Sequence, residues 1–222
     1  MMTRISKQTA ERVLEKLAAV YPDARCALNH KNALELLIAT MLSAQSTDAR
    51  VNKVTKSLFV KYRTAEDYAA VSPEILQEDI KELGLYRSKA EHIVATCRML
   101  IQEYGGEVPA SREELTRLPG VGRKTANVVL SVAFGVPALA VDTHVARVAN
   151  RIGLAESDNP LQIEQQVCEL VPKRLWSSAH HWLIHHGRQV CHARRPECAV
   201  CPVQAECQYV KQRQKEEKAH LT

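Results

Sequence analysis

The sequence contains no apolar run that approaches the ~18 residues needed to span a bilayer. Its first residues, MMTRISKQTAERV, lack the apolar centre of a secretory signal. No segment alternates apolar and polar residues with the period of two that marks a half-buried strand, and there is no long linker or low-complexity stretch. We therefore expect an all-α protein that has no membrane partner and stays in a reducing cytoplasm.

The bulk composition is that of an ordinary globular protein. Of 222 residues, 45% are hydrophobic and 25% are charged, which is enough for one large or two small domains with a sizeable core. The net charge of +5 permits a polyanionic partner but does not require one. In a reducing compartment the seven cysteines are expected to be thiols or metal ligands rather than disulfides.

Helical periodicity runs along nearly the whole chain. Apolar residues recur at helix spacing over 32–45, with Asn32 as the N-cap. The sequences SKAE at 88–91 and SREE at 111–114 are capping boxes, which predict that helices begin there. The polar tail after Tyr209 is expected to fray.

The segment LPGVGRKTANVVL, residues 118–130, joins a glycine turn to a lysine at the start of an apolar helical run. Gly120 and Gly122 both accept positive φ without steric cost, so a short helix over 112–118 and a longer one over 124–133 form a helix–hairpin–helix. Such a turn leaves backbone N–H groups at a helix N-terminus. That arrangement suits a DNA phosphate and holds a duplex without reading its sequence.

Two nucleotide-binding motifs do not fit this turn. The Walker pattern needs glycines where the chain has Arg123 and Leu118, and no strand precedes the turn. The dinucleotide fingerprint fails because Thr125 occupies the place of its third glycine. On this motif alone, a plain helix connector with a solvated lysine stays an open alternative.

Four cysteines near the C-terminus predict a metal centre. They follow the spacing C-x6-C-x2-C-x5-C, at Cys191, Cys198, Cys201 and Cys207. Four thiolates so close together imply one closed site, and zinc and an iron–sulfur cluster both accept this ligation. Between the first two ligands, Arg194 lies in a basic loop that is either a phosphate contact or simply solvated.

A helix expected over 176–186 carries four histidines beside Trp182. Their number invites a metal interpretation, but they share one amphipathic helix. We interpret them as packing and surface residues: His180, His181, His185 and His186.

Together these motifs resemble the endonuclease III family, within the helix–hairpin–helix, Gly/Pro-Asp superfamily of DNA glycosylases. The resemblance rests on LPGVGRKTANVVL, on VDTH at 141–144 and on the four cysteines, and it extends to MLSAQSTD at 41–48 and GLYRSKA at 84–90. It implies a six-helix barrel over 26–136 and an iron–sulfur domain made by 1–25 and 137–222, with a DNA cleft between them. It also implies a [4Fe–4S] cluster rather than zinc.

The resemblance assigns roles to individual residues. Lys124 matches the nucleophile and Asp142 its essential partner. Gln45 matches the residue that fills the gap left by the extruded nucleotide, and Leu85 the wedge on the opposite strand, although its position after a helix end is equally typical of a core leucine. The further DNA contacts that we expect are Gly120, Val121, Gly122, Arg123, His144 and Arg194.

The implied function is base excision repair by a bifunctional DNA N-glycosylase and abasic-site lyase. The expected partner of the protein is double-stranded DNA with damaged bases or abasic sites, and the protein is expected to act as a monomer. The target nucleotide is flipped out of the duplex, and Lys124 displaces an oxidised pyrimidine through a Schiff base. β-Elimination then cuts the strand 3′ to the abasic site.

This chemistry requires Lys124 as a free amine. A solvated lysine titrates near ~10.4, whereas a useful catalytic value lies near ~7–8, a difference of roughly 4 kcal/mol. The helix N-terminus supplies about 0.3–1 kcal/mol, so we expect desolvation to supply most of the rest. An ionised Asp142 would act in the opposite direction, so we expect it to cap its helix and to act later, on the opening sugar.

Three other functions stay open as alternatives. One is a monofunctional mismatch glycosylase, although that branch lacks a lysine at this position and usually carries a further C-terminal domain. Another is a non-catalytic helix–hairpin–helix protein that binds DNA. The third is an electron carrier, which would need a readily cycling cluster.

Overall fold

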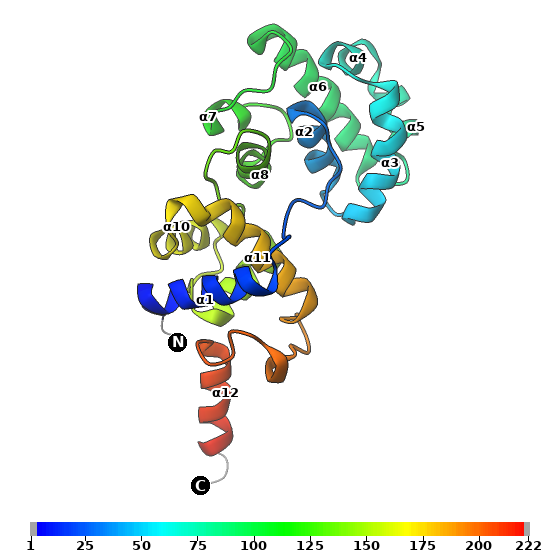
Figure 1. The fold of residues 1–222 in the computed structure, drawn as a ribbon. Helices are drawn as coiled ribbons and strands as arrows, with labels where there is room; N and C mark the ends of the chain where they lie inside the picture. Colours follow the sequence, from blue (N-terminus) through cyan, green and yellow to red (C-terminus); the bar gives the residue numbers. More distant parts are fainter. Residues whose placement is uncertain (1–3, 220–222) are drawn as a thin grey trace. The chain divides into compact units, whose positions relative to one another are not determined.

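The computed structural model describes residues 4–219, and every regular element in that range is helical (Figure 1). The predicted all-α class is therefore confirmed. The chain divides into two compact units. One is Cys26–Val136, and the other combines the residues up to Arg25 with those from Pro137 onward.

The unit over Cys26–Val136 is organised around its longest helix, α6. This helix packs against α4, α5 and α2, and α2 packs in turn against α3 and α8. The core consists of apolar side chains from nearly every helix, among them the fully buried Leu37, Leu58, Ile80 and Ile93. The helices are α2 (Ala33–Leu42), α3 (Asp48–Lys61), α4 (Ala65–Ala70), α5 (Pro73–Ile80), α6 (Tyr86–Tyr104), α7 (Arg112–Leu115) and α8 (Arg123–Ala133).

The second unit joins the N-terminal helix to the C-terminal third of the chain. Helix α11 packs against α9 and α1, and α10 packs against α9 and α1. A continuous core runs through these helices and includes Leu17, Val148, Val167 and Leu183. The helices are α1 (Lys7–Val20), α9 (Thr143–Ile152), α10 (Pro160–Leu170), the 3-10 helix η1 (Lys173–Leu175), α11 (Trp176–Gln189), η2 (Cys198–Val200) and α12 (Gln208–Ala219).

Helix starts follow the side chains that can satisfy unpaired backbone N–H groups. Asn32 accepts a hydrogen bond from the N–H of Glu35 at 2.9 Å, as predicted. The Ser111 hydroxyl accepts one from the N–H of Glu114 at 3.4 Å, which is one arm of the predicted capping box. A full capping box, which the sequence analysis missed, lies at 64–67 and opens α4.

Two local predictions are wrong. Helix α6 begins at Tyr86 rather than at Ser88, and the Ser88 hydroxyl donates to the carbonyl of Leu85 at 3.2 Å from inside the helix. The tail after Tyr209 does not fray within the described residues, because it continues as α12 to Ala219. Its Lys, Gln and Glu residues are good helix formers, and this propensity outweighs the lack of an apolar face.

Candidate functional site

The glycine turn at 118–122 is held tightly on α6. Of the two glycines in this turn, only Gly120 has positive φ, at 74°. Gly122 is extended, at φ −88°, and is the N-cap of α8. A Cβ at Gly120 would lie 2.7 Å from the Cγ of His92, so only glycine fits against that ring. One turn further along α6, the Thr96 hydroxyl donates to the carbonyl of Pro119 at 2.7 Å.

The N-terminus of α8 is open to an external anion. Its N-cap, Gly122, has no side chain to cap the helix, and the first turn contains no acidic residue. Val121 is buried at 5% exposure and anchors the turn, while Arg123 and Lys124 occupy the first two helical positions with exposed side chains. The positive helix end and two cations therefore face outward together.

The protein itself does not bury Lys124. Its side chain is exposed, so the expected desolvation is absent from the free protein. The half-buried thiol of Cys26 interacts electrostatically with this amine. Burial raises the pKa of Cys26, and the positive charge of Lys124 partly opposes that rise.

Gln45 and Leu85 lie in two strained turns. Within residues 4–219 they are the only non-glycine residues with positive φ, at 53° and 60°. Leu85 is 52% exposed, so the interpretation as a core leucine is wrong. The two turns meet through Gly84, where a Cβ would lie 3.1 Å from the carbonyl oxygen of Gln45. Strain of this kind in an exposed turn points to a functional position.

Asp142 belongs to the other unit and caps α9, as expected. Its Oδ1 accepts hydrogen bonds from the N–H groups of His144 at 2.9 Å and Val145 at 2.8 Å. No described residue bonds its second oxygen, Oδ2, so half of the carboxylate is available to a ligand. The half-buried His144 is itself held by Arg147, whose Nη2 lies 3.1 Å from its Nδ1.

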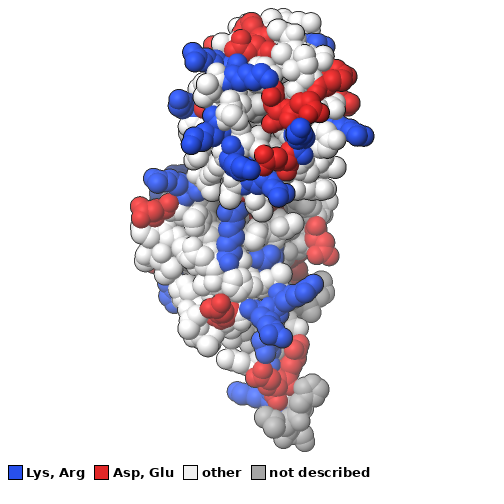
Figure 2. Space-filling view, turned by 90° about the vertical axis from the view of Figure 1, so that its right-hand side faces the viewer, with Lys and Arg blue, Asp and Glu red and all other residues white. Residues whose placement is uncertain are grey.

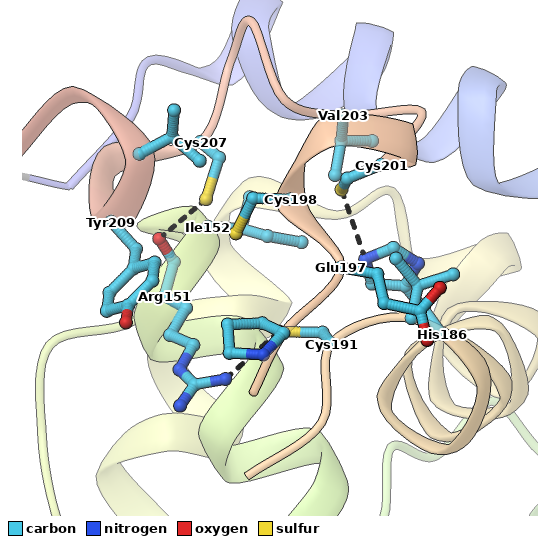
Figure 3. A pocket seen from close by; sticks show the side chains of 13 residues that line it. Arg151, Ile152, His186, Cys191, Glu197, Cys198, Cys201, Val203, Cys207 and Tyr209 are labelled. Atoms are coloured by element: carbon cyan, nitrogen blue, oxygen red, sulfur yellow. Dashed lines mark hydrogen bonds between the residues drawn. The ribbon is translucent and has the colours of Figure 1, made fainter. Parts of the chain in front are cut away.

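The four C-terminal cysteines line one cavity, and their sulfur atoms face its interior (Figure 3). The cavity lies between α9, the end of α11 and the segment that leads into α12. Burial raises the pKa of Cys201 to about 11, and negative charge on the other three cysteines adds to this effect. Four thiols that lie close together in this way repel one another when they ionise, and a cationic group between them would relieve that repulsion.

Polar groups from α9 and α11 contact three of these sulfurs. Arg151 Nη1 lies 3.5 Å from Cys191 Sγ, and the Cys207 thiol donates to the Arg151 carbonyl at 3.2 Å. His186 Nε2 lies 3.5 Å from Cys201 Sγ, and its Nδ1 lies 3.1 Å from the hydroxyl of Tyr21. Arg151 and His186 could not be assigned this role from the sequence, because nothing in the spacing of the cysteines indicates which side chains approach them.

Arg194 lies on a loop whose backbone is held by hydrogen bonds from Arg151. The Arg151 guanidinium donates to the carbonyls of His192 at 2.7 Å and Ala193 at 2.8 Å. The Arg194 side chain that follows is exposed. A fixed loop with an exposed guanidinium suits a phosphate contact.

The histidine-rich helix is a packing element. His180 is 3% exposed and its Nδ1 lies 2.7 Å from the carbonyl of Ala140. His186 is 1% exposed, and burial lowers its pKa to about 4. These contacts support the interpretation of the cluster as core and surface residues.

Basic side chains gather in several clusters on the face seen in Figure 2, with acidic side chains beside and between them. The surface therefore offers local cationic positions rather than one uniform positive field. None of the helices in the described part of the chain is both long and apolar enough to cross a membrane.

Comparisons with known proteins agree with this geometry. The model of the HhH-GPD superfamily base excision DNA repair protein matches residues 38–173. Endonuclease III of Bacillus subtilis (strain 168) is 54% identical over 203 residues, covering 91% of this chain and 93% of the relative. The Escherichia coli (strain K12) enzyme is 46% identical over 197 residues, covering 89% and 93%.

Solved structures give the same result. A trapped endonuclease III–DNA covalent intermediate has a TM-score of 0.90 and 54% identity, covering 95% of this chain and 99% of that one. A thermostable thymine-DNA glycosylase has a TM-score of 0.83 at 27% identity, covering 92% and 98%. The chain thus belongs to the HhH-GPD superfamily of base excision DNA repair proteins and, within it, to the endonuclease III family.

Proposed function

We propose that this chain repairs DNA by excising oxidised pyrimidines and cleaving the resulting abasic site, with Lys124 as the nucleophile. The observation that carries the proposal is an exposed lysine at the second position of α8, directly after a glycine turn that lacks a side-chain cap. A relative with 54% identity has been trapped covalently on DNA. A DNA substrate places the protein with the chromosome, which in a bacterium lies in the cytoplasm.

The hairpin supplies the grip on the DNA backbone. Gly120, Val121 and Gly122 present a turn against which a phosphate can approach closely, and Arg123 adds a cation beside the helix end. Such contacts fix register without reading bases. They place the exposed amine of Lys124 at the same helix end as the phosphate contact.

Lys124 attacks C1′ of the extruded nucleotide. The new C–N bond replaces the glycosidic bond, the base leaves with its electron pair, and ring opening gives a Schiff base. Loss of a proton from C2′ then expels the 3′ phosphate by β-elimination. Because the free protein leaves Lys124 exposed, we assign the required desolvation to the bound DNA itself.

Asp142 serves this reaction through the oxygen that its helix does not use. Oδ1 is occupied by the two backbone N–H groups, and this cap holds the carboxylate in place. Oδ2 stabilises positive charge on the sugar as the glycosidic bond breaks.

Extrusion of the nucleotide falls to Gln45 and Leu85. Both side chains are exposed on turns with positive φ, and the turns are in contact through Gly84. Gln45 fills the vacated space, and Leu85 inserts beside the orphaned base. Enzymes that act on a base inside a duplex pay a few kcal/mol to unstack it, and such side chains offset this cost.

The four cysteines fit a [4Fe–4S] cluster better than zinc. Zinc needs all four sulfurs about 2.3 Å from one point. All four sulfurs face one cavity. Both groups accept four thiolates, and membership of the endonuclease III family favours the cluster, which Cys191, Cys198, Cys201 and Cys207 would hold. When bound, the cluster supplies a covalent link that ties the end of α11 to the start of α12.

The test uses wild type and Lys124→Gln on duplexes that contain one thymine glycol, uracil, A·G mismatch or abasic site. We expect wild type to excise thymine glycol, cleave the abasic site and form a borohydride-reducible adduct, and Lys124→Gln to do none of these. Excision of adenine without strand cleavage would support the monofunctional alternative. Binding without cleavage or adduct would support the non-catalytic one.

A further inference from the structure

One buried charge in this molecule has no part in the chemistry above. Lys89 on α6 is only 5% exposed, and its ammonium donates to the carbonyl of Leu42 at 2.8 Å and to the hydroxyl of Ser46 at 3.3 Å. Burial lowers its pKa to about 8. Because these two partners are uncharged, the lysine is held in the interior without a carboxylate. Burying a lysine without a paired carboxylate costs free energy, which indicates that the two hydrogen bonds of Lys89 serve a specific structural purpose.

The two partners of Lys89 lie on either side of Gln45. Leu42 is the last residue of α2, and its carbonyl is one of those that a helix end leaves without a helical partner. Ser46 closes the following turn, with its N–H donating to the Ser43 carbonyl at 3.1 Å. The ammonium therefore bridges both ends of the turn that carries Gln45.

The backbone of the same residue holds Leu85. The N–H of Lys89 donates to the Leu85 carbonyl at 3.1 Å, which makes it part of the first turn of α6. Leu85 makes no side-chain cap, and this backbone bond ties its carbonyl to the start of the helix. One residue thus bonds to both strained turns, through its side chain on one side and its main chain on the other.

The contacts of Lys89 lie on the same face of α6 as the contacts that hold the glycine turn at 118–122. Leu85, Lys89, His92 and Thr96 follow one another at spacings of four, three and four residues, which places them on a single stripe of a helix. His92 lies against Gly120, and Thr96 bonds to Pro119. Helix α6 therefore fixes the distance between the two strained turns and the phosphate grip.

We propose that Lys89 is a positioning residue that holds the turns of Gln45 and Leu85 in the geometry needed to extrude a nucleotide. The inference rests on the proposed function and adds a residue to it. It acts through Gln45 and Leu85 and does not touch the reacting atoms. Its loss should therefore impair reactions that begin with a stacked, paired nucleotide and spare those that do not.

The experiment compares wild type with Lys89→Met, which keeps the length of the side chain but removes the charge and the donors. Lys56→Met, an exposed lysine on α3 of the same unit, is the matched control. Single-turnover excision of thymine glycol is measured in duplex DNA, and adduct trapping is measured on a single-stranded abasic oligonucleotide. We expect duplex excision by Lys89→Met to fall about 10- to 100-fold, the cost of a displaced contact group, with single-strand trapping unchanged.

Equal rates of duplex excision for Lys89→Met and wild type would overturn the inference, and so would a parallel fall on both substrates. If Lys89→Met does not fold, Ser46→Ala removes one of the two bonds, and a several-fold loss confined to duplex DNA is expected. No loss from Ser46→Ala would then count against the inference. Failure of wild type to form any adduct would instead overturn the proposed function, a result that no Lys89 variant can produce.

Discussion

Leu85 offers the most direct test of the link between strain and function. Two substitutions separate its side chain from its backbone. Leu85→Ala removes the wedge but keeps a Cβ at φ 60°, whereas Leu85→Gly removes the wedge and also relieves the left-handed conformation. Both variants lose the branched end of a side chain that is 52% exposed, and they differ only in the Cβ that alanine keeps, so a difference in their stability reports mainly on the backbone.

The expected difference can be worked out from the conformation. A left-handed backbone costs an L-residue about 1–2 kcal/mol, and glycine avoids this cost. Glycine also gives the unfolded chain more freedom, which offsets about 0.4–1 kcal/mol. The midpoints of these ranges make Leu85→Gly more stable than Leu85→Ala by about 0.8 kcal/mol, or roughly 2–3 °C in Tm for a chain of this size.

The assay pairs chemical denaturation with single-turnover excision of thymine glycol from a duplex. Both variants should lose excision equally, because both lack the wedge, while adduct formation on single-stranded abasic DNA persists. A glycine variant that is no more stable than the alanine variant would show that the strain is absent in solution. Full excision by either variant would show that Leu85 is not the wedge.

Three further predictions concern other parts of the site. Gly120→Ala should lower the free energy of unfolding by about 1–3 kcal/mol in chemical denaturation, because a Cβ there is strained at φ 74° and lies 2.7 Å from His92. Gly122→Ala is the control: its Cβ would meet nothing within 4 Å, so it should lower the same free energy by less than about 1 kcal/mol. Cys198→Ser should lose most of its iron and sulfide by elemental analysis, while Cys168→Ser keeps the wild-type content of about four irons per chain. The stability of wild type relative to Lys89→Met should rise between about pH 8 and the ordinary lysine value of 10.5, because unfolded Lys89 binds more protons there than folded Lys89 does, and paired urea titrations of the two proteins would measure this difference.

Features with local geometry could be predicted from the sequence. The hairpin, the cap at Asp142 and the four cysteines are each defined within a few residues, so spacing and capping rules place them. The start of α6 was misplaced because Ser88-x-x-Glu91 satisfies a capping rule that the structure does not use. The chain instead enters this helix through Leu85 in a conformation that leucine rarely adopts.

Lys89 was missed for a different reason. It lies within the GLYRSKA segment, but a lysine in a polar helical stretch is typical of a solvated surface. Its burial depends on α2 ending at Leu42, more than forty residues earlier in the chain, so only the tertiary structure indicates its role. Long-range contacts of this kind leave no pattern in a single sequence.

The two residues assigned to the chemistry come from different units, and neither is activated by its own unit alone. Lys124 is exposed, so the free protein does not supply the desolvation that an uncharged amine requires. Oδ1 of Asp142 accepts two backbone hydrogen bonds from its own helix, which leaves Oδ2 for the substrate. If bound DNA supplies the missing desolvation, the nucleophile becomes reactive only when an extruded sugar covers it. Such a nucleophile gains its reactivity from the substrate itself, which restricts the reaction to DNA that presents an extruded sugar. This selectivity would be lost if burial in the protein kept the amine neutral at all times, so an exposed nucleophile at an open helix end is consistent with a requirement to react with one substrate only.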